Sequence, residues 1–491
     1  MPDYDLAIIG GGLNGVCVAR DAAGRGLRVI LLEQGDLGAA ASSASPRFIH
    51  GDLAGLERRA LLRVRAALTE RDNWLRIAPH LVRPTRFAIP AHSDERPLWL
   101  LRSGLLLYDR LASRSRLPPS ATIDVTHHPI GNALKRPFGV AFEYSDCMVD
   151  DSRLVVAHAV DAAERGADIR TGARCVRADR RDFWRLVVID RGRRQVITAR
   201  ALVNASGAWA GSVAETVLRQ PPHSADAVRT SQIVVRRLFD TDNVYVLQNS
   251  DRRLIFASPH ERDFTLIGTV CRPFKGDPAV VSMAAADIGY LCDAANRYFR
   301  ELIDPSDVIR TISGANLVRN PAARDGWIAF DHRRRQAPLL TMVGGEVTTA
   351  RLRAERAVSK LTPFYPMSPR WTAKAALPGG EFAWDRFDVE VDAVRERWRF
   401  LGEDQARRLF AAYGSRLEAV LGNARERADL GPAFGTELTG AEVRHLMARE
   451  WARFPDDILW RRSKLGLTMP AQDREALAVF MAAGRHSSIT S

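Results

Sequence analysis

Three glycines stand between an apolar segment and a stretch at helical spacing, close to the start of the chain. Residues 5–9 (DLAII) predict a short buried strand, and residues 16–25 predict a helix. Gly10, Gly12 and Gly15 satisfy the G-x-G-x-x-G spacing, which gives a tight turn, room for a pyrophosphate, and close packing of helix on strand. A phosphate placed there meets free N–H groups at a helix N-terminus. This strand, glycine turn and helix pattern therefore predicts an α/β fold that binds a dinucleotide.

The second predicted strand ends in an acidic residue. Residues 27–32 (LRVILL) run into Glu33, eighteen residues after Gly15. A carboxylate at this place accepts hydrogen bonds from the ribose hydroxyls of an adenosine and repels a 2′-phosphate. The motif alone does not distinguish FAD from NAD. The small hydroxylated loop at 41–45 can run along a pyrophosphate toward a flavin, and this favours FAD.

Length and composition exclude several classes of protein. A chain of 491 residues predicts two or three domains. Its 46% hydrophobic and 26% charged residues are typical of globular proteins and argue against a disordered chain. Because no run of about 18 apolar residues occurs, we expect neither a spanning helix nor a signal peptide, and we expect a cytoplasmic protein.

The charge and the cysteines narrow the choice of partners. The net charge of +13 is spread along the chain, and no basic stretch is interleaved with aromatic residues, so we expect no nucleic-acid partner. The positive charge is compatible with an anionic membrane surface as a partner. The five cysteines never form a C-x-x-C pair, which predicts free thiols and no cysteine-ligated metal.

Longer motifs carry a resemblance to a known family. They are IIGGGLNG (8–15), LLEQGDL (31–37), SSASPRFIHG (42–51), FEYSDCMVDDSRLVVAHA (142–159), ALVNASGAWA (201–210), GGEVTT (344–349) and ILWRRSKLGL (458–467). With these motifs the sequence resembles the FAD-dependent, quinone-linked glycerol-3-phosphate dehydrogenases over essentially its whole length. The resemblance implies hydride transfer from a carbinol carbon of sn-glycerol 3-phosphate to flavin N5, with electrons passed to quinone in glycerol metabolism.

The resemblance also implies a domain plan. It implies an α/β fold with a Rossmann-type FAD domain, like those of glutathione reductase and D-amino-acid oxidase, a mixed-sheet substrate cap and an α-helical C-terminal domain. The expected segments are 1–80, 151–228 and 310–385 for the FAD domain, 81–150 and 229–309 for the cap, and 386–491 for the helical domain. Strand patterns at 168–176, 184–190 and 198–204, and helical patterns at 404–412 and 440–451, agree with this plan.

The expected cofactor site is intact in the sequence. Positions that match FAD-binding positions of the family are Gly10, Gly12, Gly15, Glu33, Ser42, Ser43, Val176, Gly207, Gly344, Gly345 and Thr348.

The expected substrate site differs from the family pattern. Where the family reads H-G-G-x-R-Y, this chain has Asp52, Ala54 and Gly55 in place of the second glycine, the arginine and the tyrosine. A family histidine is Gln232, and a family lysine is Glu346.

A family arginine is Asn316, and a family aspartate is Cys271, whereas Arg324 matches a further family arginine. The candidate catalytic residues are thus Glu346, Gln232 and Arg324. Arg272, Arg319 and Arg351 are further candidates to replace the lost cations.

These substitutions leave three functions open. Oxidation of a glycerol phosphate needs a base and fixed cations, and the aligned positions are five charge units more negative than the family pattern. The first alternative is a glycerol-3-phosphate dehydrogenase with rearranged anion contacts. The second is a flavoenzyme for a neutral or cationic alcohol or amine, and the third is an inactive FAD-bound structural or regulatory protein. A carboxylate at 346 in place of lysine also predicts a lower flavin reduction potential.

Membrane and assembly expectations come from the resemblance. Family members associate reversibly with the inner face of the cytoplasmic membrane through basic and apolar surface. The candidate basic surfaces here are Arg58-Arg59 with Arg63 and Arg65, residues 333–335, and Arg461-Arg462 with Lys464. The sequence leaves open whether the chain forms a homodimer.

Overall fold

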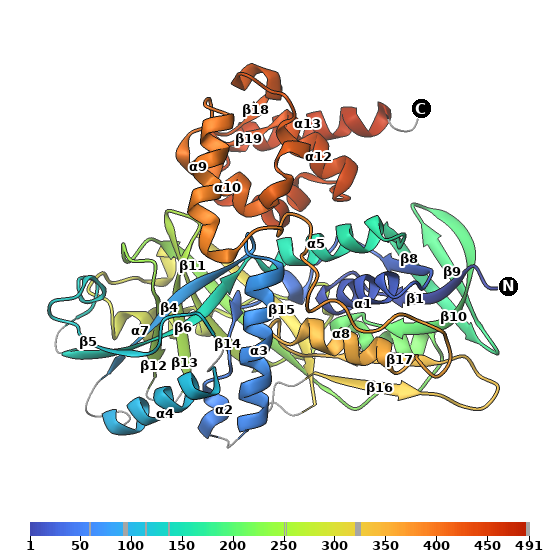
Figure 1. Cartoon of the computed structure of the whole chain (residues 1–491), viewed down its shortest axis with the longest axis horizontal. Helices are drawn as coiled ribbons and strands as arrows, with labels where there is room; N and C mark the ends of the chain where they lie inside the picture. Colours follow the sequence, from blue (N-terminus) through green and yellow to red (C-terminus); the bar gives the residue numbers. More distant parts are fainter. Residues whose placement is uncertain are drawn as a thin grey trace.

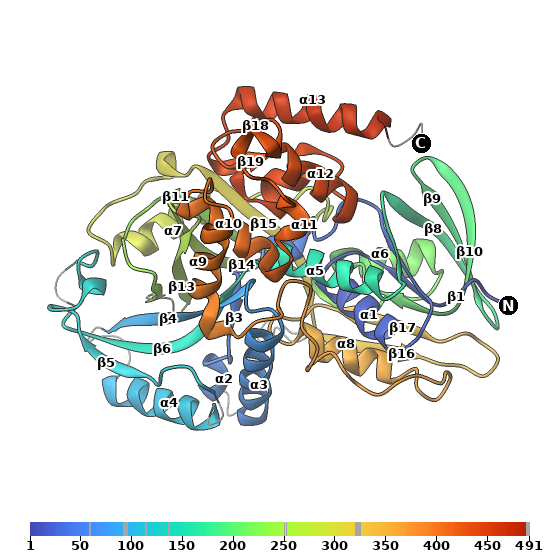
Figure 2. The ribbon, with the colours of Figure 1, turned by 45° about the horizontal axis from the view of Figure 1, so that its top comes forward.

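The computed structural model describes residues 1–57, 60–91, 97–112, 115–135, 138–249, 251, 253–319 and 326–487. Within these ranges the chain forms two large sheets that lie side by side, with a helical domain over their upper side (Figures 1 and 2). The N-terminus lies at the far end of the first sheet, and the chain ends in the helical domain.

The first sheet carries the predicted dinucleotide fold. Its strand order is β16-β17-β10-β1-β2-β7, and β8 and β9 continue from β10 as a meander. The bounds are β1 Tyr4–Ile9, β2 Val29–Glu33, β7 Asp168–Thr171, β8 Ala173–Arg180, β9 Trp184–Asp190, β10 Arg193–Asn204, β16 Trp327–Asp331 and β17 Leu339–Val343. β1 is parallel to both neighbours, with Ile8 opposite Val203 and Leu31. Strands buried on both sides read as continuous apolar runs, which is why β1 and β2 could be predicted.

Three helices cover one face of this sheet. They are α1 Leu13–Gly24, α5 Asp151–Glu164 and α8 Ala350–Ser359. Val16, Leu154 and Val358, one from each helix, belong to a single buried cluster with Ile8 and Leu31 of the strands. The β8–β9 meander encloses a smaller cluster that includes Ile9 and Leu32, with Val213 and Val217 of the segment after β10 packed against it. The carboxyl ends of β1, β2, β10 and β17 therefore open on one edge, where ligands bind in α/β sheets.

The second sheet is the cap. Its order is β15-β11-β14-β13-β12-β4-β6-β3, with β5 paired to β6. The bounds are β3 Phe48–Ile49, β4 Val82–Ala91, β5 Ala121–Asp124, β6 Val140–Val149, β11 Asp226–Arg236, β12 Val244–Gln248, β13 Leu254–His260, β14 Phe264–Pro273 and β15 Arg310–Val318. Helix α7 (Ala285–Asn296) covers one face around Leu291.

Two strands differ from the expected segment boundaries. β15 pairs with β11 along nine residues, so it lies in the cap sheet, although residues from 310 on were expected in the FAD domain. β3 pairs with β6 and also lies in the cap sheet, although residues 1–80 were expected in the FAD domain. β15 follows α7 and the strands β11 to β14, which are all in the cap, so the chain leaves the cap sheet only after β15. The other boundaries stay predictions.

Two helices lie at the base of the molecule, on the side away from the helical domain (Figures 1 and 2). They are α3 Leu61–Ile77 and α4 Leu98–Leu111, and the short α2 (Ala54–Glu57) precedes α3. α4 exposes Leu98, Trp99, Leu100, Leu106 and Leu107 to solvent. None of the helices in the described ranges is long and apolar enough to cross a membrane.

The C-terminal domain is helical, as expected. Its main helices are α9 Phe387–Arg397, α10 Glu403–Tyr413, α11 Glu418–Leu421, α12 Gly440–Arg449 and α13 Ala471–Ser487, and a short strand pair joins Ala433–Phe434 (β18) to Leu438–Thr439 (β19). These helices share a buried cluster that includes Phe410, Leu446 and Leu477.

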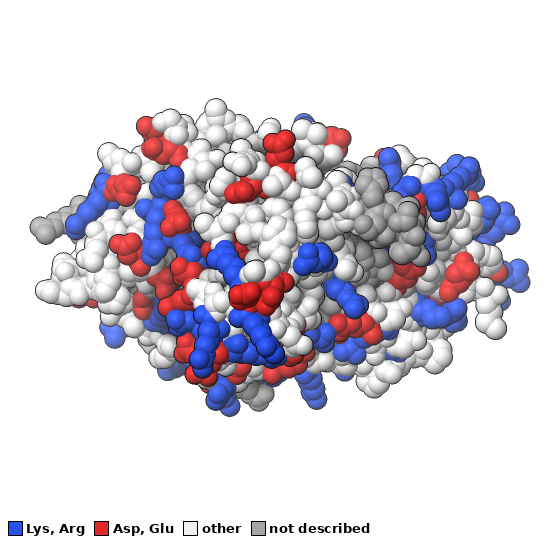
Figure 3. All heavy atoms as spheres, turned by 90° about the horizontal axis from the view of Figure 1, so that it is seen from above, with Lys and Arg blue, Asp and Glu red and all other residues white. Residues whose placement is uncertain are grey.

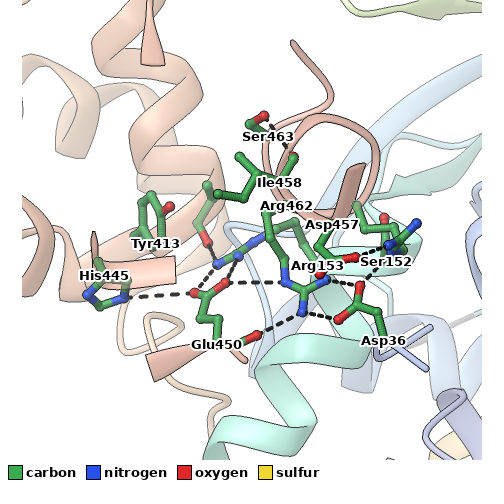
Figure 4. A network of polar contacts seen from close by, with 12 residues as sticks. Asp36, Ser152, Arg153, Tyr413, His445, Glu450, Asp457, Ile458, Arg462 and Ser463 are labelled. Atoms are coloured by element: carbon green, nitrogen blue, oxygen red, sulfur yellow. Dashed lines mark hydrogen bonds and ion pairs between the residues drawn. The ribbon is translucent and has the colours of Figure 1, made fainter. Parts of the chain in front are cut away.

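Buried ion pairs join this domain to the FAD domain (Figure 4). Arg462 donates two hydrogen bonds of 2.7 Å to the carboxylate of Asp36, in the loop after β2. Arg153 on α5 donates to both carboxylate oxygens of Glu450. Lys464 pairs with Asp150. Arg461, Arg462 and Lys464 were expected on a basic surface, but these ion pairs place them in the domain interface instead.

Charge on the upper face is mixed. Lys and Arg lie beside Asp and Glu over much of this face, rather than in one basic field (Figure 3). Many arginines form ion pairs, among them Arg408 with Glu442 and Arg262 with Asp404.

Candidate active site

The predicted phosphate turn has the geometry that its glycines require. Gly10 has φ of +111°, and a Cβ there would lie 2.5 Å from the carbonyl oxygen of Ala205. A Cβ on Gly15 would lie 1.9 Å from the carbonyl oxygen of Gly10, so only glycine fits between strand and helix. Gly12 is the N-cap of α1 and has no side chain with which to cap the helix. The N-terminus of α1 thus presents backbone to an anion, as the motif predicts.

Glu33 lies beside this turn at the end of β2. Its carboxylate accepts hydrogen bonds from the N–H groups of Gly11 and Gly35, each at 2.7 Å. Burial raises the pKa of Glu33, and the two N–H donors oppose that rise. These donors fix the carboxylate at the position where the ribose of an adenosine is expected.

Two serines of the following loop have different partners. The Ser42 hydroxyl accepts a hydrogen bond of 3.0 Å from the N–H of Leu13, in the first turn of α1. The Ser43 hydroxyl instead donates to the carbonyl of Ala40, within its own loop. Ser42 therefore joins the loop to the phosphate turn, whereas Ser43 stiffens the loop itself.

A second glycine pair lies between β17 and α8. Gly344 and Gly345 have φ of +63° and +101°, which favour glycine. Asn14 of α1 donates to the Gly344 carbonyl, and Arg353 donates to Asn14 and to the Glu346 carbonyl. This loop is thereby tied to the phosphate turn, although 330 residues separate them in the sequence.

Three further predicted positions lie on this edge or near it. The Thr348 hydroxyl accepts from the N–H of His50, and the Thr348 carbonyl accepts from the indole of Trp74. Gly207 follows β10 with φ of +59°, and a Cβ there would meet open space. Val176 is half-buried in the bulge where β8 pairs with β9.

The turn at 10–15, Glu33 and the loops at 41–45 and 344–348 together form what we call the flavin cradle, and their geometry fits FAD. The turn of Gly10 to Gly15 leaves no room for side chains, Glu33 faces the adenosine position, and the loops at 41–45 and 344–348 continue from it toward the cap. These turns and loops present backbone groups of the kind that bind a pyrophosphate and a flavin.

Gln232 on β11 closes this path from the cap side. The side chain is buried, and its amide donates to the carbonyls of Ala44 and Ser45 at 3.3 and 3.0 Å. Gly268 lies opposite on β14, and a Cβ there would come within 2.5 Å of the Gln232 side chain. Gln232 was a candidate catalytic residue, and in the structure its amide is bound to the loop at 41–45.

Three charged side chains meet at the other predicted site. The Arg63 guanidinium lies 3.0 Å from the Asp52 carboxylate and 3.9 Å from the Glu346 carboxylate. Arg63 comes from α3, Asp52 from the loop after β3, and Glu346 from the loop after β17. Asp52 and Glu346 were predicted to share a site. Arg63 was expected on a membrane surface, and nothing in its helical neighbourhood indicated that it turns inward.

The other arginines considered as replacements lie elsewhere. Arg272 pairs with Asp287 of α7, on the face of the cap sheet that α7 covers. Arg351 is buried between Glu70 and Glu355. Arg324, a candidate catalytic residue, lies outside the described residues, as do Arg58 and Arg59.

A buried polar group beneath the flavin loop was not predicted. Ser45 donates to Asp151 at the start of α5, and Arg47 has its guanidinium 2.7 Å from the ring of His260. Burial, and then the nearby Arg47, hold the pKa of His260 well below its ordinary value, so this ring is neutral. Long-range contacts of this kind leave no local pattern in a sequence.

Comparison with known proteins agrees with this geometry. The family model described as FAD dependent oxidoreductase matches residues 5–350, and that of the C-terminal domain of alpha-glycerophosphate oxidase matches residues 370–484.

Three relatives match nearly the whole chain. They are the glycerol-3-phosphate dehydrogenase of Pseudomonas aeruginosa, at 40% identity over 97% of this chain and 95% of the relative, the aerobic glycerol-3-phosphate dehydrogenase of Escherichia coli, at 39% over 98% of each, and the D-erythritol 1-phosphate dehydrogenase of Brucella abortus, at 39% over 96% of each. The solved glycerol-3-phosphate dehydrogenase of Bacillus halodurans in complex with FAD has the same fold, with a TM-score of 0.79, 24% identity, and coverage of 98% of this chain and 90% of that one. The relatives match the FAD domain, the cap and the helical domain alike. The chain is therefore a member of the FAD-dependent glycerol-3-phosphate dehydrogenase family.

Proposed function

We propose that the chain oxidises a secondary alcohol of the polyol class at the edge where Glu346 and Asp52 meet the flavin cradle. The observation that carries this proposal is that Glu346 directly follows Gly345, in the loop that is tied to the phosphate turn. FAD, when bound, supplies the acceptor for a hydride from the carbinol carbon. The substrates in the relatives' names, glycerol 3-phosphate and D-erythritol 1-phosphate, define the compounds to try first.

The hydroxyl proton needs an acceptor, and the geometry favours Glu346 over His50. The Nδ1 atom of His50 accepts a hydrogen bond of 3.0 Å from the N–H of Asp52. A neutral imidazole that accepts at Nδ1 carries its proton on Nε2, so it has no second acceptor for a substrate. Glu346 keeps 27% of its side chain exposed and is acceptor-only when ionised. We therefore assign proton transfer to Glu346, and the family resemblance makes Arg324 a further candidate for substrate contact.

The test is an anaerobic absorbance titration of the purified FAD protein with sn-glycerol 3-phosphate, glycerol and erythritol. Bleaching of the visible flavin band by any of them supports the proposal. A Glu346→Gln variant should still bind FAD but bleach about 100-fold more slowly or worse, in line with the loss of a general base. A flavin that dithionite reduces, but that none of a broad panel of alcohols reduces, would leave only the structural role.

We also propose that the base of the molecule associates reversibly with an anionic membrane and delivers electrons to a quinone there. Trp99 is 69% and Leu62 85% exposed, and both belong to an apolar surface formed by α4 and the start of α3. Arg65, Arg102 and Arg110 are exposed on the same two helices. An apolar helix face edged by arginine is the composition of an interfacial membrane helix.

Sedimentation with vesicles tests this surface. Vesicles with about 30% phosphatidylserine should retain the protein at low salt and release part of it at high salt, because arginine contacts are screened. Trp99→Glu should reduce the retained fraction, whereas Trp460→Glu in the helical domain should not. An equal loss of vesicle retention in both variants would contradict the assignment of α4 to the membrane contact.

A further inference from the structure

The carboxylates of Asp52 and Glu346 both lie near the Arg63 guanidinium, and Arg353 donates to the backbone carbonyl of Glu346. Arg63 reaches Asp52 with Nε and lies farther from Glu346, so its charge is divided between two acids. The backbone of Asp52 has φ of +57°, a conformation that L side chains rarely adopt, and its side chain is only 10% exposed. Arg63 and Glu346 keep about a quarter of their side chains exposed. The cluster is therefore partly open to a ligand, and Asp52 is its buried side.

On the side of the cap, β11 and β15 carry uncharged polar side chains on the face that meets the loop at 41–45. Side chains alternate along a strand, so Thr230 shares the face of Gln232, which points at the flavin loop. Thr230 lies opposite Gly314, and a Cβ on Gly314 would touch Ala44 in that loop. Asn316 lies two residues farther along β15, on the same face. The amides of Gln232 and Asn316 thus stand where the family pattern has histidine and arginine, with the Thr230 hydroxyl on the same face.

The charge balance of this site disfavours a phosphate dianion. The ionised side chains of Asp52, Glu346 and Arg63 together carry a net charge of −1. A further guanidinium, that of Arg353, is bound to the Glu346 carbonyl, Thr349 and Asn14 on the side of the phosphate turn. Two like charges at about 4 Å repel by roughly 4 kcal/mol at an effective dielectric near 20, before screening by solvent. Arg272 and Arg351 are held by other carboxylates.

A polyol fits the same groups. Carboxylates accept hydrogen bonds from hydroxyls, and a guanidinium and amides donate to hydroxyl oxygens. We propose that Asp52, Arg63 and Glu346 bind the hydroxyls of an uncharged polyol, and that this cluster sets specificity against phosphorylated polyols. The proposal rests on the proposed function, because it names the substrate class of the same site.

The experiment compares substrates in the FAD-loaded enzyme and in variants. The ratio of kcat/KM for erythritol to that for sn-glycerol 3-phosphate is measured with an artificial electron acceptor. The parent should prefer the uncharged polyol, and Glu346→Lys should shift the ratio toward the phosphate by about 100-fold. Glu396→Lys, on the exposed face of α9, makes the same charge change far from the site and should leave the ratio unchanged.

A binding measurement separates the two proposals. Inorganic phosphate is titrated into the oxidised enzyme while the visible flavin spectrum is followed. If no alcohol reduces the flavin, the proposed function fails, yet phosphate should still perturb Glu346→Lys at concentrations at least tenfold lower than the parent. Equal perturbation of the two proteins would overturn the specificity proposal.

Other outcomes also decide. A parent that prefers sn-glycerol 3-phosphate and loses that preference in Arg324→Ala would assign a phosphate to that arginine and overturn the proposal. Preference for an amino alcohol over both substrates would overturn the polyol assignment. Should Glu346→Lys fail to hold FAD, Glu346→Gln serves instead, with a smaller shift expected in the same direction.

Discussion

Gln232 replaces a family histidine, and its contacts show a positioning residue. Its amide donates to two carbonyls of the flavin loop, Ala44 and Ser45, from a fully buried position. Removing the donors leaves buried carbonyls without those bonds, at a cost of about 1–3 kcal/mol.

We expect Gln232→Ala to weaken FAD binding by about tenfold or more, because the loop that runs along the cofactor loosens. The dissociation constant is measured from the recovery of flavin fluorescence on dilution. Gln405→Ala is the matched control, since Gln405 is also buried and donates to the carbonyl of Glu437 in the helical domain. An equal loss of FAD in both variants would show a general loss of stability.

Glu346 has a second expected effect, on the flavin itself. The family resemblance puts residue 346 near the part of the flavin that gains negative charge on reduction, and a carboxylate there opposes reduction. Arg63 lies 3.9 Å from Glu346 and offsets part of this effect. Glu346→Lys should therefore raise the two-electron midpoint potential by on the order of 30 mV, which corresponds to about 1.4 kcal/mol. A spectroelectrochemical titration that finds no rise would contradict this placement.

These side chains show what a sequence can and cannot indicate about a site. Glu346 and Gln232 were found because motifs on both sides fix their alignment. Arg63 was missed because its helix is rich in arginine, and only the packing of α3 against two distant loops shows which arginine turns inward. Arg47 and His260 were missed for the same reason, since 213 residues separate them.

Helix α5 is buried on most of its surface and contains a histidine that stays neutral. The His158 ring donates from Nδ1 to the carbonyl of Leu154 and packs against the edge of Trp74. Burial, with a smaller contribution from Arg20, lowers the pKa of His158 to about 3. The unfolded chain binds this proton near pH 6.5 and the native state does not, so stability falls as the pH drops from 6.5 toward 3.

We expect His158→Phe to flatten this loss, because a phenyl ring fits beside Trp74 and cannot take up a proton. The midpoint of thermal unfolding, followed by circular dichroism between pH 7.5 and 5, should fall less steeply in the variant than in the parent. His127→Phe is the control, since the side chain of His127 is 84% exposed. Parallel curves for His158→Phe and the parent would assign the acid sensitivity to other groups, such as His80.

Among the elements, those with local patterns were predicted well. Residues 5–9 became β1 (Tyr4–Ile9), and residues 404–412 became α10 (Glu403–Tyr413), each with a shift of about one residue. Residues from 310 on were expected in the FAD domain, yet β15 pairs with β11 of the cap sheet, because the residues of an edge strand do not say which sheet it joins.

The helical domain and the FAD domain are held together by buried charges close to the cofactor. Burial alone would raise the pKa of Asp36, but Arg462 and Arg461 lower it below its ordinary value, so the carboxylate stays ionised in the interface. Asp36 is three residues beyond Glu33, and Lys464 reaches Asp150, next to the Asp151 that holds Ser45. The C-terminal domain therefore contacts both the loop after Glu33 and the start of α5, which binds Ser45.

Removal of Arg462 tests this coupling. Arg462→Met leaves the Asp36 carboxylate buried beside Arg461 alone, and breaking such a pair costs about 3–5 kcal/mol. Flavin release and loss of secondary structure should occur together at a lower temperature than in the parent, measured by flavin fluorescence and circular dichroism. Arg397→Met, which breaks an exposed pair with Glu418, should change the midpoint little. If Arg462→Met unfolds like Arg397→Met, the apolar contacts between the domains are sufficient to hold them together, and the ion pairs at Asp36 contribute mainly to the orientation of the loop after β2.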